Sequence, residues 1–434
     1  MIIHVVQSQD TIYSIAEEYG VTVNKLIQDN GLENPYSLVV GQTLVILFPV
    51  QTHTVREGDA LSGLANTYDI SHLKLLQNNS FLSDRECLYP GETIVIRYNK
   101  KGTIVSNGYA YPYIKKNTLI KTLPYLTYLS VFNYRVSGEG DVSAYYDDSE
   151  IIPLAIQYGV IPLMMLSAVS LQGEPNMEVI FNVLLSDEYQ DRIIDKILVI
   201  LKTKNYYGVN VIFSSINEIN DHLYINYLRN ISNRLQREGY LLFVTINPNM
   251  KYVDNQITFD GIDYTRISRL VNGITFLQYV WGTNSAPPQP VSSINFLRTF
   301  IDYVVHAAPP ELIALGSPLI SYDWELPYMP EKNIAHALTL QSAIALANDV
   351  GAEIHFDDAS RTPYFQYGRY TFGSPVEHMV WSIDARSMDA LNDLVAEYNL
   401  GGTGIWNIMI YSQQLWSIIN SQYEIIKIIS DNLP

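Results

Sequence analysis

The sequence predicts an α/β protein in which a (β/α)8 barrel follows two small βααβ units. Apolar, strand-like runs alternate with amphipathic helical patterns along residues 104–408, and eight such runs point to a TIM barrel. A segment near the start of the chain recurs further on, which indicates two copies of one small unit. The 434 residues are 47% hydrophobic and 16% charged, as expected for a globular chain of two or three domains.

The internal repeat is visible in two pairs of segments. Each pair keeps its apolar spacing: residues 4–16 (HVVQSQDTIYSIA) match 53–65 (HTVREGDALSGLA), and 40–46 (VGQTLVI) match 90–96 (PGETIVI). The two copies cover residues 1–49 and 50–98, and each is expected to run strand, helix, helix, strand.

Polar residues mark the expected helix ends in both copies. Asp10 and Asp59 stand where an N-cap would open the first helix. Asn30–Gly31 in the first copy and Asn78–Asn79 in the second are placed to end the second helix.

The barrel is expected over residues 104–434, after a short polar linker at 99–103. Its strands are predicted at 104–111, 128–133, 160–167, 208–214, 241–246, 274–279, 312–316 and 404–408. Its clearest helices are predicted at 187–202, 220–238, 292–307, 334–349 and 387–398. The segment at about 350–383, rich in Tyr, Phe, Gly and Asp, predicts a small β-rich insertion before the last strand.

One predicted barrel strand has an unusual composition. Residues 205–215 (NYYGVNVIFSS) form an apolar, β-branched run of strand length. No carboxylate occurs between Lys196 and Asn217, although the chain has 44 acidic residues against 27 basic ones.

The repeated unit resembles LysM modules, which bind N-acetylglucosamine polymers. In that family the glycan lies between the first strand–helix loop and the second helix–strand loop. The resemblance therefore implies a sugar-binding role for Gln9, Asp10, Thr11, Asn30, Gly31, Gly58, Asp59 and Asn79.

The rest of the chain resembles family 18 glycoside hydrolases, the chitinase-like barrels. Within that family it is most similar to spore-cortex and peptidoglycan N-acetylglucosaminidases, which also carry two LysM modules. The matching segments are NGYAYP at 107–112, YVWG at 279–282, YDWELP at 322–327, WSIDARS at 381–387 and GIW at 404–406.

The resemblance also exposes a mismatch at the catalytic strand. The family signature, roughly D-G-(I/V)-x-(I/V)-D-(F/W)-E, supplies a Glu that protonates the leaving oxygen and an Asp that orients the substrate's N-acetyl group. Its carboxylate positions hold Tyr207, Ile212 and Ser214, and Val280 stands where an acid usually follows the strand-six Tyr. A serine hydroxyl is too weak an acid to protonate the leaving oxygen, and isoleucine has no polar atom to orient the substrate, so we expect a pseudoenzyme.

Aromatic residues at the expected barrel mouth are retained. By resemblance, Tyr279 would contact the acetyl group and Trp406 would form the floor of the sugar site, with Trp281, Trp324 and Trp381 as further sugar contacts. Glu218 is the one candidate for a relocated acid, although an acid there also suits the start of the next helix. No cofactor or metal is expected, since the histidines show no ligand spacing.

Charge and the chain start narrow the partners. A net charge of −17 argues against nucleic acid, anionic membranes and strongly anionic polymers, and favours a neutral glycan.

The single cysteine, Cys87, excludes an internal disulfide and is expected to be buried. The first residues show no signal peptide, and no run reaches the ~18 apolar residues of a membrane span. We therefore expect synthesis in the cytoplasm, no membrane insertion, and association with the spore or cell wall.

Three functions remain open at this point. The first is glycan binding (peptidoglycan, spore cortex or chitin-like) by the LysM modules and a degenerate barrel. The second is an active N-acetylglucosaminidase with a relocated acid. The third is a structural spore-coat or wall protein, with spore or wall proteins as its partners.

Overall fold

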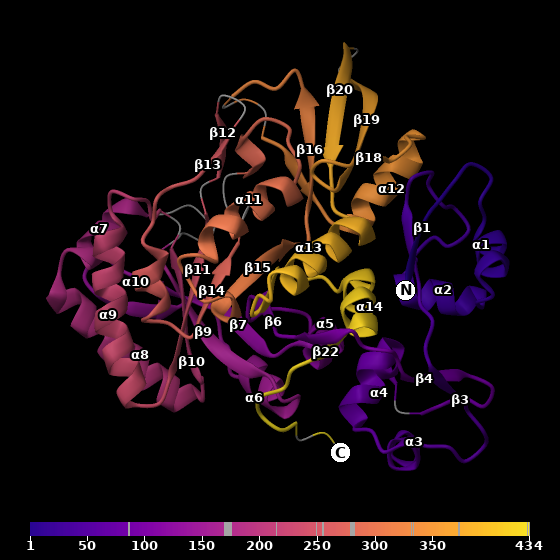
Figure 1. Ribbon diagram of the computed structural model, residues 1–434, viewed down its shortest axis with the longest axis horizontal. Helices are drawn as coiled ribbons and strands as arrows, with labels where there is room; N and C mark the ends of the chain where they lie inside the picture. The colour runs from indigo at the N-terminus through magenta and orange to yellow at the C-terminus, as the bar shows by residue number, and fades with distance from the viewer. Residues whose placement is uncertain are drawn as a thin grey trace.

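The computed structural model describes residues 1–85, 87–168, 176–213, 215–248, 250–253, 256–277, 283–330, 332, 334–371, 374–431 and 433. Two small modules lie on one side of a barrel, and an additional sheet rises above the barrel (Figure 1). Among the helices described, none is long and apolar enough to cross a membrane.

Eight parallel strands form the closed barrel that the sequence predicts. In chain order they are β6 (Ser106–Ala110), β7 (Tyr128–Val136), β9 (Ile161–Ser167), β10 (Gly208–Phe213), β11 (Leu241–Ile246), β14 (Gly273–Phe276), β15 (Ile313–Pro318) and β21 (Gly402–Trp406). Each strand pairs with the next, and β21 returns to pair with β6, which closes the ring. Strands buried on both faces are near-continuous apolar runs, as the sequence of β10 illustrates.

Helices cover the outside of the barrel. They are α5 (Lys116–Thr122), α6 (Ile151–Gln157), α7 (Met177–Leu184), α8 (Asp187–Lys204), α9 (Asp221–Arg237), α10 (Tyr264–Ser268), α11 (Ile294–Val304), α13 (Ala385–Glu397) and α14 (Gln413–Gln422). Their ends follow local rules: Ser186 caps α8 through the amide of Tyr189, and Lys202 and Lys204 lie in its last turn. Further short strands lie outside the barrel ring. Strand β5 (Gly102–Ile104) pairs with β22 (Tyr423–Ile425), and β8 (Val142–Ala144) pairs antiparallel with the end of β7. Strand β12 (Lys251–Val253) pairs with β13 (Gln256–Thr258).

The insertion is larger than expected. Its antiparallel sheet contains β16 (Ser321–Leu326), β17 (His336–Leu338), β18 (His355–Asp357), β19 (Thr362–Thr371) and β20 (Ser374–Trp381). The sheet therefore begins at Ser321, well before the expected start near residue 350, because β16 pairs along its length with β20. Helix α12 (Leu340–Val350) starts later than the predicted 334 because residues 336–338 form β17 and Thr339 caps the helix.

Both modules have the predicted order of strand, helix, helix, strand. The first contains β1 (Ile2–Val5), α1 (Ile12–Tyr19), α2 (Val23–Asn30) and β2 (Thr43–Ile46), and the second contains β3 (Gln51–Thr54), α3 (Leu61–Tyr68), α4 (His72–Asn78) and β4 (Thr93–Arg97). Module one has its own small core, built around Ile12, Ile15 and Leu44. The core of module two is continuous with that of the barrel.

Candidate functional site

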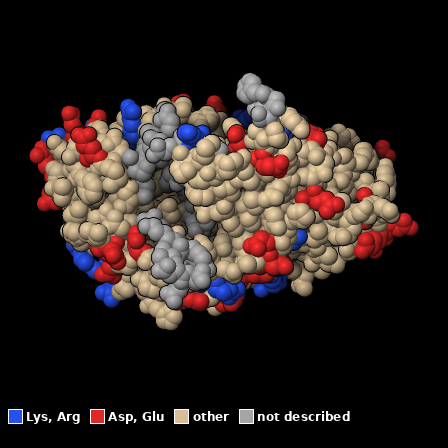
Figure 2. All heavy atoms as spheres, turned by 90° about the horizontal axis from the view of Figure 1, so that it is seen from above, with Lys and Arg blue, Asp and Glu red and all other residues tan. Residues whose placement is uncertain are grey.

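The mouth of the barrel lies at the carboxyl ends of its strands, where TIM barrels carry their chemistry. The β12–β13 hairpin and the insertion sheet both follow such strand ends and rise on this side (Figure 1). Figure 2 looks down on this end of the molecule, where the surface is hollowed and acidic side chains are spread over the face.

The floor of the mouth is an aromatic and apolar cluster. Trp406, the last residue of β21, has its ring centre 5.6 Å from that of Tyr109 and 5.9 Å from that of Phe132. Met165 and Ile212 complete the cluster, and Ile212 is only 7% exposed. Ile212, which the resemblance predicts to stand at the position of an orienting Asp, is thus an apolar side chain packed among aromatic rings.

A line of tyrosines leads outward from this floor. The Tyr111 ring lies 5.0 Å from Phe132 and stacks on Tyr113 at 5.3 Å, and Tyr113 meets Tyr146 at 4.9 Å. Tyr113 and Tyr146 are exposed, whereas burial raises the pKa of Tyr111 to about 12. Flat faces with polar tips suit sugar rings. Sequence reasoning missed this line; the alternating tyrosines of residues 109–113 at a strand end were the available signal for its first half.

Beneath the floor, the barrel interior holds a neutral hydrogen-bond network. Asn210 donates from Nδ2 to Ser130 Oγ at 3.0 Å and accepts from Thr245 Oγ1 at 2.9 Å. The Tyr109 hydroxyl lies 2.9 Å from Thr245 Oγ1, and burial raises the pKa of Tyr109. Amide and hydroxyl groups of this kind satisfy one another without an ionised partner.

The predicted barrel residues divide into three groups. Ser214, Tyr279, Val280 and Trp281 lie outside the described residues, so their roles stay predictions. Trp406 packs against the floor cluster, and its contact with sugar stays a prediction. Trp324 and Trp381 are buried in the insertion: Trp324 donates to the carbonyl of Ala286 at 2.9 Å, and Trp381 packs 4.8 Å from Tyr364. The expected sugar contacts of these two tryptophans are corrected to core packing, because both side chains belong to the core cluster that continues into the barrel.

Two other predicted positions, Tyr207 and Glu218, do not belong to the floor cluster. Tyr207 precedes β10 and is therefore at the opposite end of the barrel from the mouth, where it is 37% exposed. Glu218 is exposed in the turn before α9, and its carboxylate lies against Gly261. The acidic residue that opens α9 is Asp221.

In the modules, Asp10 and Asp59 do not cap helices, which differs from the sequence prediction. Asp10 accepts a 2.7 Å hydrogen bond from the backbone amide of Gln7 and lies 3.0 Å from His4 Nε2. The hydrogen bond from the Gln7 amide holds the pKa of Asp10 below its usual range. The cap of α1 is Thr11, which accepts from the amide of Ser14 at 3.0 Å. Asp59 makes the same pair of contacts in module two, where Ala60 stands at the cap without a side-chain bond. Each aspartate accepts its hydrogen bond from an amide three residues earlier and so stabilises the turn before the helix instead of the helix end.

Asn30 and Asn79 are buried and hold each module together. Asn30 donates to the carbonyl of Val45 at 2.9 Å and accepts from its amide at 2.6 Å. Asn79 bonds Val95 in the same way, at 2.8 Å in both directions. Their side chains are therefore used within the module, which corrects the expectation that these amides meet sugar. Gln9 and Gly58 are exposed on the first loops, where a sugar-binding role stays a prediction.

The two modules present different surfaces beside these loops. In module one, the exposed rings of Tyr13 and Tyr36 stack at 6.0 Å with an interplanar angle of 21°. In module two, the corresponding loop carries Arg85, which pairs with Glu92 through two bonds of 2.7 and 2.8 Å. An aromatic platform and an arginine–carboxylate pair are chemically distinct, so the modules are not duplicates at their surfaces.

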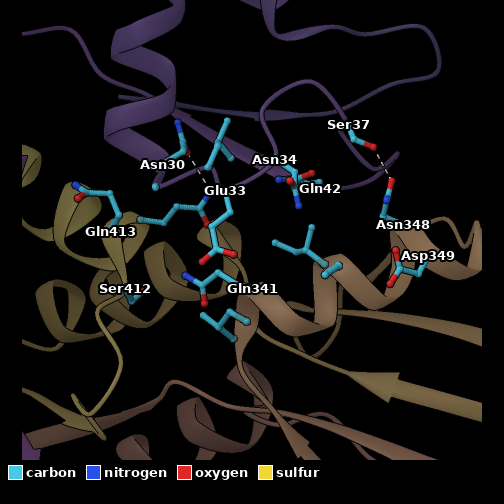
Figure 3. Close-up of a pocket in the computed structure, with 16 residues that line it drawn as sticks. Asn30, Glu33, Asn34, Ser37, Gln42, Gln341, Asn348, Asp349, Ser412 and Gln413 are labelled. Carbon is cyan, nitrogen blue, oxygen red and sulfur yellow. Dashed lines mark hydrogen bonds between the residues drawn. The ribbon is translucent and has the colours of Figure 1, made fainter. Parts of the chain in front are cut away.

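A cleft of about 110 Å³ separates module one from the barrel (Figure 3). The end of α2 and the loop after it line one side of the cleft, and α12 and the start of α14 line the other. Most of its polar side chains are amides or hydroxyls: Asn30, Asn34, Ser37, Gln42, Gln341, Asn348, Ser412, Gln413 and Gln414. Gly31 ends α2 here with φ 62°, and a Cβ on it would lie 2.8 Å from Gln413 Cβ, so only glycine permits this approach.

Within the described residues, no group of three His, Cys, Asp or Glu side chains is arranged to hold a metal ion. Cys87 is exposed rather than buried, because it lies in the surface loop before β4.

Comparison with known proteins identifies the class. The model of glycosyl hydrolases family 18 matches residues 167–409, and the LysM domain model matches residues 4–47 and 53–97. The chain therefore belongs to glycosyl hydrolase family 18 and carries two LysM domains.

Individual relatives share the whole architecture. The cortical fragment-lytic enzyme of Bacillus anthracis is 29% identical over 97% of this chain and 98% of its own length. The crystal structure of the spore cortex-lytic enzyme SleL of Bacillus megaterium QM B1551 has a TM-score of 0.79 and 30% identity, covering 98% of this chain and 99% of that one. SleL of Bacillus cereus gives a TM-score of 0.78 and 28% identity over the same shares.

Proposed function

We propose that this protein binds N-acetylglucosamine-containing glycan without cleaving it, through its LysM modules and a degenerate family 18 barrel. The observation that carries the proposal is the apolar and aromatic environment of the Ile212 side chain. This residue stands at the orienting position, packs with Tyr109, Phe132 and Met165, and lies in the same cluster as Trp406. An apolar wall beside an aromatic floor can hold a sugar ring but offers it no carboxylate from this position.

The chemistry of the family supports the loss of cleavage. Its mechanism needs an acid for the leaving oxygen and an orienter for the N-acetyl group, and this chain has Ser214 and Ile212 at those positions. General acid catalysis alone is worth about 10²–10⁴-fold in rate. A serine hydroxyl does not supply it, and isoleucine has no polar atom to orient the substrate.

The relatives support the choice of glycan. Two of them are named for lysis of spore cortex or its fragments, and they match this chain along nearly its full length. We infer that the ligand is cortex peptidoglycan or a chitin-like chain and that the protein is associated with the spore or cell wall.

The proposal is tested by separating binding from turnover. Co-sedimentation with cortex peptidoglycan and calorimetry with chitooligosaccharides should show binding, while product analysis should show no cleaved glycan. The double variant Ile212→Asp with Ser214→Glu restores both carboxylates and should gain measurable hydrolysis if the rest of the mouth is intact. Clear turnover by the unmodified protein contradicts the proposal, and its loss in Glu218→Gln would identify a relocated acid.

A further inference from the structure

A second, larger cleft lies between the two modules. This intermodule cleft has a volume of about 700 Å³, within the range of ligand-binding pockets. Helix α2 of module one forms one wall, and residues 77–81 and 90–93 of module two form the other. Helix α14 of the barrel closes its inner end, and Figure 1 shows the modules one above the other beside α14.

Hydrogen bonds between α14 and each module fix both walls. Ser417 Oγ donates to the carbonyl of Asp29 in module one at 2.7 Å. Ser80 of module two donates to Gln413 Oε1 at 2.7 Å, and Asn420 Nδ2 donates to Asn78 Oδ1 at 2.9 Å. The cleft is therefore held open by the barrel, and a ligand would not have to order it.

The chemistry of the lining favours an uncharged ligand. Three charged side chains line the cleft within the described residues, and each is paired: Lys25 with Asp29 at 2.7 Å, and Glu92 with Arg85. The other polar groups are amides and hydroxyls, which both donate and accept hydrogen bonds. Phe48, which is 45% exposed, and Phe81 add aromatic faces. A peptide with free carboxylates would find no unpaired cation among these groups, whereas a neutral sugar matches them.

We propose that the intermodule cleft binds a short stretch of neutral, N-acetylated oligosaccharide, so that one glycan chain contacts both modules. The loop at residues 79–81, which the LysM resemblance places in the groove of module two, is itself a wall of the cleft. A chain leaving that groove continues along α2 of module one. This inference rests on the proposed glycan binding and adds a site that neither module has alone.

The test uses fluorine NMR on the full chain carrying Phe48→Trp and labelled with 5-fluorotryptophan. The chain has five native tryptophans, of which Trp406 reports the barrel mouth, and the substitution adds one reporter in the cleft. Titration with tetra-N-acetylchitotetraose should shift the added resonance to saturation. Cellotetraose, which lacks acetamido groups, should leave it in place.

A blocking variant supplies the control. Gln28 is an exposed residue of α2 that lines the cleft, and Gln28→Phe should weaken the titration at least tenfold. Gln236→Phe makes the same change on an exposed residue of α9, outside the lining, and should leave the affinity within twofold of the parent.

The outcomes separate the two proposals. Heat of binding in calorimetry without any shift of the added resonance would overturn the cleft site and leave the proposed function standing. No heat and no shift at any resonance would overturn both. Equal shifts with both oligosaccharides would overturn the assigned ligand class.

Discussion

Gln414 Nε2 donates a 3.0 Å hydrogen bond to Asn30 Oδ1 and a 2.7 Å bond to the carbonyl of Thr43. The last barrel helix thus contacts the same asparagine that ties α2 to β2 in module one. Module one is docked through specific polar contacts rather than held only by the chain that joins it to module two.

We expect Gln414→Ala to loosen module one from the barrel. Two acceptors lose a donor in a part-buried interface, which costs about 1–2 kcal/mol. Hydrogen-exchange mass spectrometry should show faster exchange in peptides that cover α2 and β2. Gln236 is an exposed residue of α9, and the control variant Gln236→Ala should leave the exchange rates of these peptides unchanged. Unaltered exchange in Gln414→Ala would mean that other contacts dock the module.

A matched pair of glycines tests the same interface by steric contact. Gly41 and Gly91 occupy equivalent positions in the two modules, with φ of 87° and 92°. A Cβ at Gly41 would lie 1.9 Å from the carbonyl oxygen of Ile354, whereas a Cβ at Gly91 meets nothing within 4 Å. Both alanine variants carry the strain of positive φ, about 1 kcal/mol. Only Gly41→Ala should also displace module one, detected as a lower melting temperature than that of Gly91→Ala and an increased hydrodynamic radius.

The barrel floor predicts an effect on affinity. Trp406→Ala removes the ring that packs beside Tyr109 and Phe132, and we expect binding of chitooligosaccharide at the barrel to weaken about tenfold, equivalent to ~1.4 kcal/mol. Calorimetry with the full chain measures it. Trp406→Phe keeps an aromatic face and should recover most of the loss. Affinity that is equal in all three proteins would place the glycan elsewhere.

The fold was largely predictable because its signals are local. The run at residues 241–246 became β11 with the same bounds, and 208–214 became β10 within one residue. The predicted start of the insertion is too late in the chain because β16 is defined by pairing with β20, more than 50 residues further along. Such pairing leaves no mark in the local pattern of a short segment.

The candidate site was less predictable, for similar reasons. The family resemblance predicts a catalytic position at Ile212, but the packing of Ile212 against Phe132 and Met165 depends on two other strands. Trp324 matched a mouth segment of the family and still turned inward, toward the carbonyl of Ala286. The sequence pattern predicts a helix cap at Asp10 because it does not reveal the hydrogen bond from the Gln7 amide or the contact with His4.

A buried carboxylate predicts a pH dependence of stability. Asp148 is 1% exposed and accepts hydrogen bonds from Tyr134 at 2.5 Å, Tyr206 at 2.7 Å, and Lys204. Burial alone would raise the pKa of Asp148, but these hydrogen bonds outweigh burial and hold the pKa below the ordinary 3.8. A carboxyl whose folded pKa is depressed contributes stability above its unfolded pKa and loses it as the pH falls through the folded value.

We therefore expect Asp148→Asn to lower the free energy of unfolding by about 2 kcal/mol at neutral pH, since one of the donors loses its acceptor. The difference between the two proteins should begin to shrink as the pH falls below 3.8, where the carboxyl of the unfolded chain becomes protonated. It should be lost once the pH falls through the lower folded pKa and the native carboxylate is protonated as well. Urea unfolding across this pH range measures it. The neighbouring Asp147 bonds Ser149 at the surface, so Asp147→Asn should have a much smaller effect at neutral pH. A difference for Asp148→Asn that stays constant with pH would show that the stabilisation does not depend on the ionised carboxylate.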